Sequence, residues 1–406
     1  MFELSIEYIY LCTGTKQIIQ MKNFEYYNPV RILFGKNQIA KMRPFLPKEG
    51  VILMIYGAGS IKSNGVYDQV KRALEGMEVI EFGGIEPNPK YEALLPAIEI
   101  VKKERVSFIL SVGGGSVIDA SKFIAAGSRY AGNDPWDILS GEGEVLSAIP
   151  LGVVLTLPAT GSEMNGNAVI SRHSSKEKFA FSSPMVLPVF SVLDPQVTYS
   201  LPMNQVINGV VDAFVHVIEQ YLTYPVYAPV QDRYAESLLQ ILKVEGPKAI
   251  NFDLPDYDNR ATIMWAATNA LNHFLSMGVI TDWATHTLGH ELTALHGLDH
   301  AVTLAIILPG VLNSVKENRK EKLLQYAERI WGLSGFDHIA VIDEAIRRTE
   351  NFFECLGTKT HLSDYGIGME TIDLIERRLI DRGVNLIGNS KDITIDNVRG
   401  ILESRL

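Results

Sequence analysis

Cysteine is scarce in this sequence. Only Cys12 and Cys355 occur among its 406 residues, which excludes a disulfide framework and any metal site built on paired cysteines. Small extracellular domains often depend on such bridges, whereas this chain is 47% apolar and long enough to bury a full core without them. We therefore expect a protein of the reducing cytoplasm.

Basic clusters and long hydrophobic runs are also missing. The formal net charge is −10, so we expect no binding to nucleic acid, which draws its affinity from clustered Lys and Arg. The longest apolar run, around 302–312, contains Pro309 and is far shorter than the roughly 20 residues of a membrane span. The first twenty residues, MFELSIEYIYLCTGTKQIIQ, lack the features of a secretory signal. We interpret residues 1–20 as an extension that precedes a folded body beginning at Met21.

The first half of that body alternates short apolar runs with longer amphipathic stretches. VILMIYG, EVIEF and SFILSVGGG are typical strands, and residues 66–75, 91–104 and 116–127 have the period of helices. This order predicts βαβ units and a mostly parallel sheet covered by helices. The sequence thus predicts a Rossmann-like α/β domain over residues 21–198.

The second half has helical period with few strand signals. Helices are predicted at 205–222, 229–249, 259–276, 283–296 and 301–314. The stretch DPQVTYSLP, which contains two prolines, lies where the pattern changes. We therefore predict an all-helical domain over residues 199–406.

One predicted helix carries a carboxylate that needs an explanation. VINGVVDAFVHVIEQYL is apolar on almost every face, yet it holds Asp212 and His216 at a four-residue spacing that puts both side chains on one face. A buried carboxylate is costly unless it is paired or bound to a cation. From this helix alone, a hydrogen-bonded Asp–His pair and a metal site are equally good interpretations.

A second segment, HTLGHELTALHGLDH, contains four histidines and favours the metal site. His286 and His290 repeat the four-residue spacing on one predicted helix. Gly297 is placed to end that helix and Asp299 to cap the next, so His300 falls in the first turn that follows. One carboxylate and several neutral imidazoles from three helices predict a site for Zn(II) or Fe(II).

Two glycine turns follow predicted strands in the first half. Three glycines, 113–115, precede Ser116 at a helix start, where free N–H groups and close backbone approach suit a pyrophosphate. Ile118 occupies the third-glycine position of the usual dinucleotide fingerprint, and a glycine run alone is more often a simple turn. An earlier strand ends in the glycine-rich turn at 57–60, and two such turns at strand ends favour a nucleotide site.

Together these motifs resemble the iron-containing, or group III, alcohol dehydrogenases. The resemblance covers essentially everything after residue 21, and it rests on GGGSVIDASK, TLPATGSEMN, DAFVH, DP at 194, LP at 201 and the spacing of His286, His290 and His300. Within the family, RILFG, NDPWDIL and WATHTLGHELTALHGLDHA are most similar to butanol dehydrogenases and NADPH-dependent broad-range aldehyde reductases.

The resemblance implies roles for particular residues. It implies metal ligands at Asp212, His216, His286 and His300, and an additional active-site histidine at His290. It implies cofactor contacts at Gly57, Ala58, Gly59, Ser60, Asn88, Gly113, Gly114, Gly115, Ser116, Asp119, Thr156 and Lys178. It also implies a homodimer and reversible hydride transfer between NAD(P)H and small aldehydes or primary alcohols, with reduction favoured.

The choice between NADP and NAD depends on two parts of the sequence, the first glycine turn and the second predicted strand. Ala58 stands where the family's first turn often has an aspartate, and Lys62 follows, so a 2′-phosphate meets no negative charge in that turn. Glu81, in the second strand, is the acid that would instead favour NAD. We expect NADP to be preferred at least about tenfold.

Other functions fit parts of the pattern. A glycerol dehydrogenase or dehydroquinate synthase would use the same scaffold, and a non-enzymatic binder of metal or nucleotide would use the same ligands. A nucleotide-independent metallohydrolase would need a carboxylate base, for which Glu291 is the nearby candidate, although it points away from the face of His286 and His290.

Overall fold

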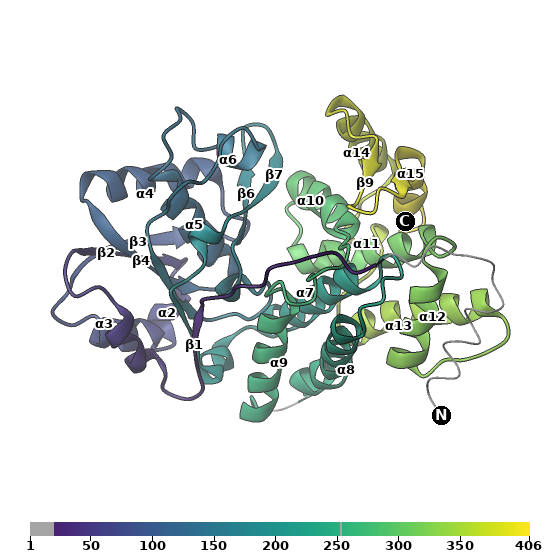
Figure 1. The fold of residues 1–406 in the computed structure, drawn as a ribbon, viewed down its shortest axis with the longest axis horizontal. Coiled ribbons are helices and arrows are strands. Elements are labelled where there is room, and N and C mark those ends of the chain that lie inside the picture. Colours follow the sequence, from purple (N-terminus) through teal and green to yellow (C-terminus); the bar gives the residue numbers. More distant parts are fainter. Residues whose placement is uncertain (1–19, 252–253) are drawn as a thin grey trace.

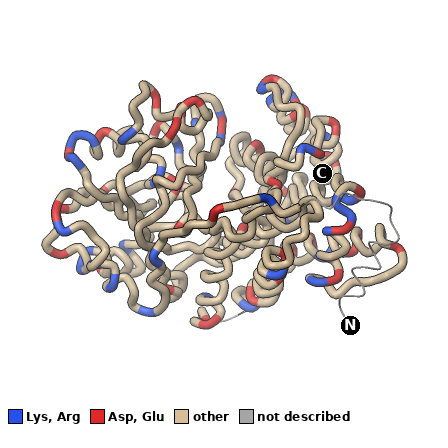
Figure 2. The backbone as a smooth tube through the Cα atoms, in the orientation of Figure 1, with Lys and Arg blue, Asp and Glu red and all other residues tan. Residues whose placement is uncertain are grey.

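The protein has two halves, one built on a parallel sheet and the other on helices (Figure 1). The computed structural model describes residues 20–251 and 254–406. The predicted extension, residues 1–20, therefore lies almost wholly outside the described residues. In Figure 2 the positively and negatively charged residues are interspersed along the backbone of both halves.

Within the described residues, the first half contains a six-stranded parallel sheet with the strand order β1-β8-β5-β4-β2-β3. The strands are β1 (Arg31–Phe34), β2 (Val51–Gly57), β3 (Glu78–Ile85), β4 (Val106–Gly113), β5 (Leu151–Leu155) and β8 (Phe190–Leu193). Strands β5 and β8 are buried along their whole length, as expected for central strands covered on both faces. The predicted parallel sheet is confirmed.

Helices cover both faces of this sheet. Odd-numbered residues of β2 such as Leu53 pack against α4 (Tyr91–Lys103) and α5 (Gly115–Gly127). Even-numbered residues such as Met54 pack against α3 (Val66–Ala73) and the 3-10 helix η1 (Ile39–Phe45). The alternation of a strand's side chains between two faces produces this three-layer arrangement. Two single-turn helices, α2 (Ser60–Ser63) and α6 (Asp137–Ser140), complete this half together with short 3-10 turns.

An antiparallel hairpin extends from the sheet half and was not predicted. Its strands are β6 (Asn167–Arg172) and β7 (Glu177–Ser182). Figure 1 shows the hairpin on the side of the sheet half that faces α10 and α14. It therefore belongs to the region where the two halves meet.

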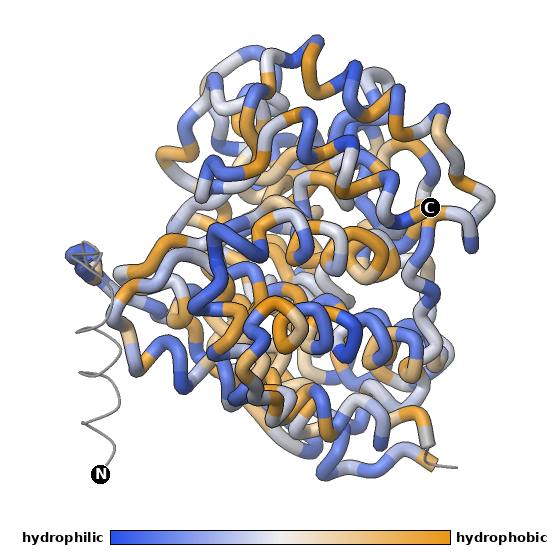
Figure 3. Tube along the Cα trace, turned by 90° about the vertical axis from the view of Figure 1, so that its right-hand side faces the viewer, coloured by the Kyte–Doolittle hydropathy of each residue, from blue (hydrophilic) through white to orange (hydrophobic). Residues whose placement is uncertain are grey.

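In its described residues, the second half has helices and a short strand pair with two residues in each strand, β9 (Leu386–Ile387) and β10 (Ile393–Thr394). The helices are α7 (Met203–Tyr221), α8 (Pro229–Asn251), α9 (Tyr257–Ala270), α10 (Ala284–His296), α11 (His300–Ser314), α12 (Lys320–Trp331), α13 (His338–Cys355), α14 (Met369–Asp381) and α15 (Ile395–Glu403). In Figure 3, hydrophobic and hydrophilic residues alternate along the outer helices, as amphipathic helices require. Among the described residues, no helix combines the length and apolar character needed to cross a membrane.

One helix is shorter than its pattern predicts. We expected residues 259–276 to be helical, but α9 ends at Ala270. The Asn272 side chain accepts a hydrogen bond from the Phe274 backbone N–H at 3.0 Å, and His273 adopts a positive φ of 69°. This local side-chain to backbone contact competes with the helix and ends it.

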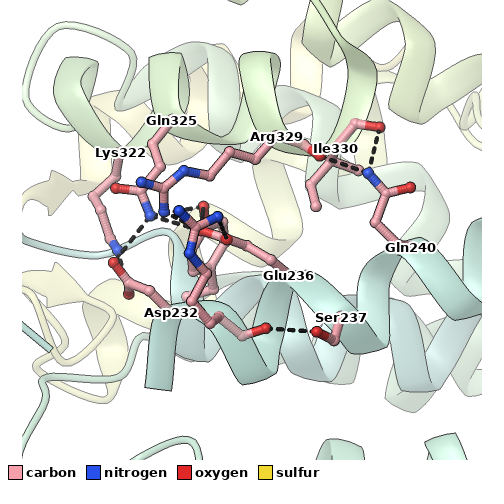
Figure 4. A network of polar contacts seen from close by, with 10 residues as sticks. Asp232, Glu236, Ser237, Gln240, Lys322, Gln325, Arg329 and Ile330 are labelled. Carbon is pink, nitrogen blue, oxygen red and sulfur yellow. Dashed lines mark hydrogen bonds and ion pairs between the residues drawn. The ribbon is translucent and has the colours of Figure 1, made fainter. Parts of the chain in front are cut away.

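The helical half is braced by polar contacts as well as by its apolar core. Between α8 and α12, Lys322 donates to Asp232 at 2.6 Å and Arg329 donates to Glu236 at 2.6 Å (Figure 4). Gln325 bonds both carboxylates, at 2.9 Å each. Because Lys322 and Glu236 are buried, each charge depends on its partner for stability.

The first described residues lie along the helical half before they enter the sheet. Lys22 donates its backbone N–H to the carbonyl of Gly278 at 2.9 Å, and Tyr26 packs edge-on against Phe274. Figure 1 shows this dark purple segment crossing in front of both halves to reach β1. The sequence-based domain assignment, which places residues 21–198 with the sheet, does not anticipate these contacts.

Candidate active site and cofactor site

The predicted metal ligands meet where three helices converge. Asp212 and His216 lie one turn apart on α7, His286 lies on α10, and His300 is the first residue of α11. Gly297, with φ of 69°, ends α10 and allows α11 to begin three residues later. This backbone geometry brings His300 next to the face that carries His286.

Asp299 does not cap α11 as expected. It occupies the N-cap position, but its side chain makes no capping hydrogen bond and instead accepts one from Asn208 at 2.9 Å. Asn208 is on α7, so the contact links the start of α11 to the helix that carries Asp212. Asp299 therefore contributes to helix packing at this site.

The ligand atoms of the cluster are close together. The two Nε2 atoms of His216 and His286 are 3.1 Å apart. Asp212 Oδ1 lies 3.5 Å from His216 Nδ1 and 3.8 Å from His300 Nε2. One ligand atom from each of Asp212, His216 and His286 lies within 4.8 Å of the others. Such a set could hold one metal ion.

The hydrogen bonds of the cluster are incomplete, which tests whether a cation fits there. Within the described part of the chain, Asp212 Oδ1, His216 Nδ1 and His300 Nδ1 are buried atoms with no hydrogen bond. Buried polar atoms normally have partners, and an ion coordinated at this point would supply one to the carboxylate. One carboxylate with three imidazoles suits either Zn(II) or Fe(II). The donor set therefore fits a divalent cation.

Burial keeps the imidazoles of this cluster neutral at neutral pH. It lowers the pKa of His216 and of His286 to about 4. Burial, with the positive charge of Lys178 as the next cause, also lowers the pKa of His290 and of His300 well below the usual value. A neutral imidazole is the form that binds a metal ion.

Glu219 is a part of the site that sequence reasoning missed. It lies on α7, buried, and its carboxylate accepts hydrogen bonds from His286 Nδ1 and, at 2.6 Å, from the backbone N–H of Thr285. With Nδ1 engaged, Nε2 of His286 is the nitrogen left to face His216. Its position three residues after His216, on the same apolar helix, was the available signal.

His290 lies beside the cluster. Its ring centre is 5.3 Å from that of His300 and 6.2 Å from that of His286. Among the described residues its Nε2 atom has no hydrogen-bond partner. The neighbouring Glu291 is turned to the other side, where Arg378 and Arg382 bind its carboxylate.

The two glycine turns lie at the carboxyl ends of adjacent strands. Gly57 ends β2 and is followed by Ala58, Gly59 with φ of 112°, and Ser60 at the start of α2. Gly113 ends β4, which pairs with β2, and its turn leads into α5. This is the edge of a parallel sheet at which nucleotides bind in such folds.

The glycines of the second turn also allow the chain to pack on itself. A Cβ atom at Gly113 would lie 2.4 Å from Val117 Cγ2, and one at Gly115 would lie 2.6 Å from Thr160 Oγ1. At Gly114 it would meet Leu157 at 3.0 Å. We argued for close ligand approach from the sequence, and the structure adds a requirement for internal packing.

Each of the other predicted cofactor residues has a hydrogen-bond partner in the structure. Thr156 donates its backbone N–H to Gly113 at 3.0 Å. Lys178, on β7, donates to the Asn88 side chain at 2.9 Å, and Asn88 has a positive φ of 53°. Asp119 accepts hydrogen bonds from Ser162 at 2.7 Å and from the Val169 backbone at 3.0 Å.

Lys178 lies on β7, a strand that contacts α10. Burial lowers its pKa to about 8, opposed by the negative charges of Asp119 near the glycine turn and Asp212 in the metal cluster. Strand β7 thus puts one cation within electrostatic range of both sites. The hairpin strand β7 therefore connects the surroundings of the two predicted centres.

Lys122 was not predicted as part of this region. It is fully buried on α5 and donates to Ser162 Oγ at 2.8 Å, Asn165 Oδ1 at 3.1 Å and Asn167 O at 2.8 Å. Burial lowers its pKa to about 7. The i, i+3 spacing from Asp119 was the available signal, since both side chains hold the loop that contains Ser162.

The candidate acid of the second strand is already engaged. Glu81, on β3, accepts hydrogen bonds from Tyr67 at 2.8 Å, Lys71 at 3.0 Å and Tyr56 at 3.3 Å. Lys62 lies over the Tyr56 ring, 4.9 Å from its centre. The carboxylate of Glu81 therefore has a positive partner beside it.

Two family models match the chain, one for each half. The model described as iron-containing alcohol dehydrogenase matches residues 29–195, and the C-terminal model of the Fe-containing alcohol dehydrogenase family matches residues 206–406. The chain belongs to the iron-containing alcohol dehydrogenase family. It is accordingly an NAD(P)H-dependent oxidoreductase of the alcohol dehydrogenase class.

Individual relatives agree with this assignment. The chain is 55% identical over 386 residues to the NADPH-dependent aldehyde reductase YqhD of Escherichia coli K12, covering 95% of this chain and 100% of the relative. It is 40% identical over 391 residues to probable NADH-dependent butanol dehydrogenase 1 of Bacillus subtilis, covering 95% and 100%. The crystal structure of E. coli YqhD superimposes with a TM-score of 0.93 at 53% identity, over 95% of this chain and 100% of that chain.

A further solved structure shows the same fold at lower identity. The crystal structure of NADH-dependent butanol dehydrogenase A from Thermotoga maritima superimposes with a TM-score of 0.90 at 35% identity. The superposition covers 95% of this chain and 99% of that chain. The predicted combination of an α/β domain and a helical domain is thereby confirmed, as is the predicted family. The alternative of a nucleotide-independent metallohydrolase is set aside.

Proposed function

We propose that this enzyme reduces small aldehydes to primary alcohols with NADPH, at a divalent metal ion held by Asp212, His216, His286 and His300. The overall reaction consumes one aldehyde, one NADPH and one proton, and yields one alcohol and NADP⁺. The observation that carries the proposal is the cluster of one carboxylate and several imidazoles in which, among the described residues, Asp212 Oδ1, His216 Nδ1 and His300 Nδ1 are buried without a hydrogen bond. It is supported by the two glycine turns at the facing edge of the sheet.

The chain's own side chains prepare this chemistry. When bound, a divalent cation stabilises negative charge that develops on a substrate oxygen. Glu219 orients the His286 ring through its Nδ1 atom, and burial keeps the ligand imidazoles neutral. We assign His290 to carry a proton between solvent and the substrate oxygen, because its Nε2 atom has no hydrogen-bond partner among the described residues and its ring lies beside His300.

The cofactor would bind along the turns at the ends of β2 and β4. Its pyrophosphate would meet Gly113 to Ser116 at the start of α5, and Lys178, Asn88, Asp119 and Thr156 would frame the same crevice. We propose a preference for NADP over NAD of at least about tenfold. Two features support it: Ala58 adds no charge to the first turn, and Lys71 offsets the charge of Glu81.

We also propose a homodimer of the cytoplasm. Strand β1 is an edge strand, and its Phe34 side chain packs on Trp265 while both remain partly exposed. Beside them, Tyr26, Met164 and Phe274 line an open cavity of about 730 Å³ that includes none of the four proposed metal ligands. Exposed aromatic side chains around an unpaired strand edge favour association with a second copy.

One experiment tests the proposed reaction. Metal-free protein would be loaded separately with Fe(II) or Zn(II), and loss of the NADPH absorbance band would be followed with butanal. We expect NADPH to be oxidised only when both aldehyde and metal are present. We expect NADH to be oxidised more slowly under the same conditions. NADPH oxidation that is equally fast in metal-free protein would contradict the proposal, as would faster oxidation of butanol than reduction of butanal at pH 7.

A further inference from the structure

The hairpin that carries Lys178 is attached to both halves of the protein. On the sheet side, the backbone N–H groups of His173 and Ser174 donate to Glu92 at 3.2 Å each, and Ser171 bonds the carbonyl of Pro89 at 2.9 Å. These contacts fix the hairpin to the start of α4. On the helical side, the guanidinium of Arg378 on α14 donates to the carbonyl of Lys176 at 2.7 Å.

The same guanidinium reaches the helix that carries the metal cluster. Arg378 Nε donates to Glu291 Oε2 at 2.8 Å, and Glu291 is buried on α10 directly after His290. A planar guanidinium presents a fixed fork of donors and can bind a carboxylate and a carbonyl at once, whereas a lysine ammonium is a compact point charge without that fork. One side chain therefore joins α10 to the tip of the hairpin.

The contact of Arg378 at the hairpin tip lies close in sequence to Lys178. Lys176 adopts a positive φ of 53°, so its conformation depends on surrounding contacts. Two residues further on, Lys178 donates to Asn88 at 2.9 Å. The hairpin that carries Lys178 is thus linked to α10 through Arg378 and Glu291.

We infer that Arg378 is a positioning residue: it holds the β6–β7 hairpin against the metal-bearing half and so sets Lys178 and Asn88 for cofactor binding. The inference rests on the proposed function for the role of Lys178 and Asn88. Arg382 provides a matched control, because it also binds Glu291 yet, among the described residues, makes no hydrogen bond to the hairpin. The two arginines differ in the contact to Lys176.

The first test uses protein without cofactor. Amide hydrogen exchange of the 170–180 segment would be compared in wild type, Arg378→Ala and Arg382→Ala. We expect exchange about tenfold faster in Arg378→Ala, the scale of one lost hydrogen bond, and rates within twofold of wild type in Arg382→Ala. Equal rates in the two variants, or a wild-type rate in Arg378→Ala, would overturn the inference whether or not the proposed reaction is correct.

The second test uses the metal-loaded enzyme. Arg378→Ala should raise the KM for NADPH about five- to tenfold with kcat within about twofold and metal content unchanged. If hydrogen exchange rises but NADPH binding does not weaken, the contact does not serve cofactor binding and the inference fails. Should Arg378→Ala not fold, Arg378→Lys keeps a cation at Glu291 and should show the same faster exchange and raised KM.

Discussion

The proposed metal site and the proposed cofactor site are built in different ways. The proposed metal site uses side chains from α7, α10 and α11, and its ligands are an aspartate and histidines, which are residue types that commonly bind metal ions. The proposed cofactor site uses backbone turns at Gly57–Ser60 and Gly113–Ser116, with polar side chains nearby that form hydrogen bonds, such as Lys178 with Asn88 and Ser162 with Asp119. Because of this difference, replacing a metal ligand should remove both metal and activity, whereas a substitution in the cofactor turns should only shift the preference for one cofactor.

The largest expected effect is removal of a proposed metal ligand. His286→Ala or His300→Ala should reduce bound metal from one ion per chain to a small fraction and reduce activity at least about a hundredfold, because each side chain offers a ligand atom that nothing else replaces. Elemental analysis of purified protein and steady-state rates would measure both.

A neighbouring histidine is the control for these variants. His296 lies on the same helix but donates to or accepts from Thr371 at 3.0 Å, away from the cluster. His296→Ala should keep its metal. Full metal content in His286→Ala and His300→Ala would disprove the ligand assignment.

The next effect in size concerns the carboxylate behind His286. Glu219→Gln keeps the size of the side chain but weakens the bond that orients the ring, so metal affinity should fall about 10- to 100-fold. Competition with a chromogenic chelator would give the affinity without any measurement of activity. Glu236→Gln, a buried carboxylate in the α8–α12 contacts of Figure 4, should lower stability and leave metal affinity unchanged.

A smaller and selective change is expected in the preference for NADPH over NADH. Ala58→Asp adds a negative charge to the first turn, so the ratio of kcat/KM for NADPH to that for NADH should fall at least about tenfold. Glu81→Gln should leave that ratio within about twofold, because Lys71, Tyr67 and Tyr56 already bind this carboxylate. A large change in the ratio for Glu81→Gln, with none for Ala58→Asp, would reverse the assignment.

The last effect is on stability and not on binding or activity: a pH dependence at Lys122. Burial lowers its pKa in the folded protein to about 7 from an unfolded value of 10.5, so between these values the unfolded chain binds more protons. The free energy of unfolding should therefore rise with pH over this window. Compared with Lys122→Met, the wild type should gain stability as the pH rises from 7 to 9. A difference in melting temperature that stays constant with pH would contradict this.

Local patterns in the sequence predicted much of the fold. Short apolar runs predicted β2 and β4, and helical period predicted α7, α10 and α11. Both signals lie within a single short segment, where backbone geometry relates residue spacing directly to secondary structure. The end of α9 at Ala270 was mispredicted, because the Asn272 turn competes with the helix in a way that hydrophobic period does not reveal.

The sequence by itself determined the chemistry that is available: an aspartate and histidines at helical spacing, and glycines where the backbone must turn tightly. Only the tertiary structure decided how these groups are held. Glu219 meets His286 from 67 residues away, and Arg378 meets Lys176 from 202 residues away. Spacing within one helix or turn is fixed by backbone geometry, whereas contacts between distant segments depend on how whole helices and strands pack, which no local pattern encodes.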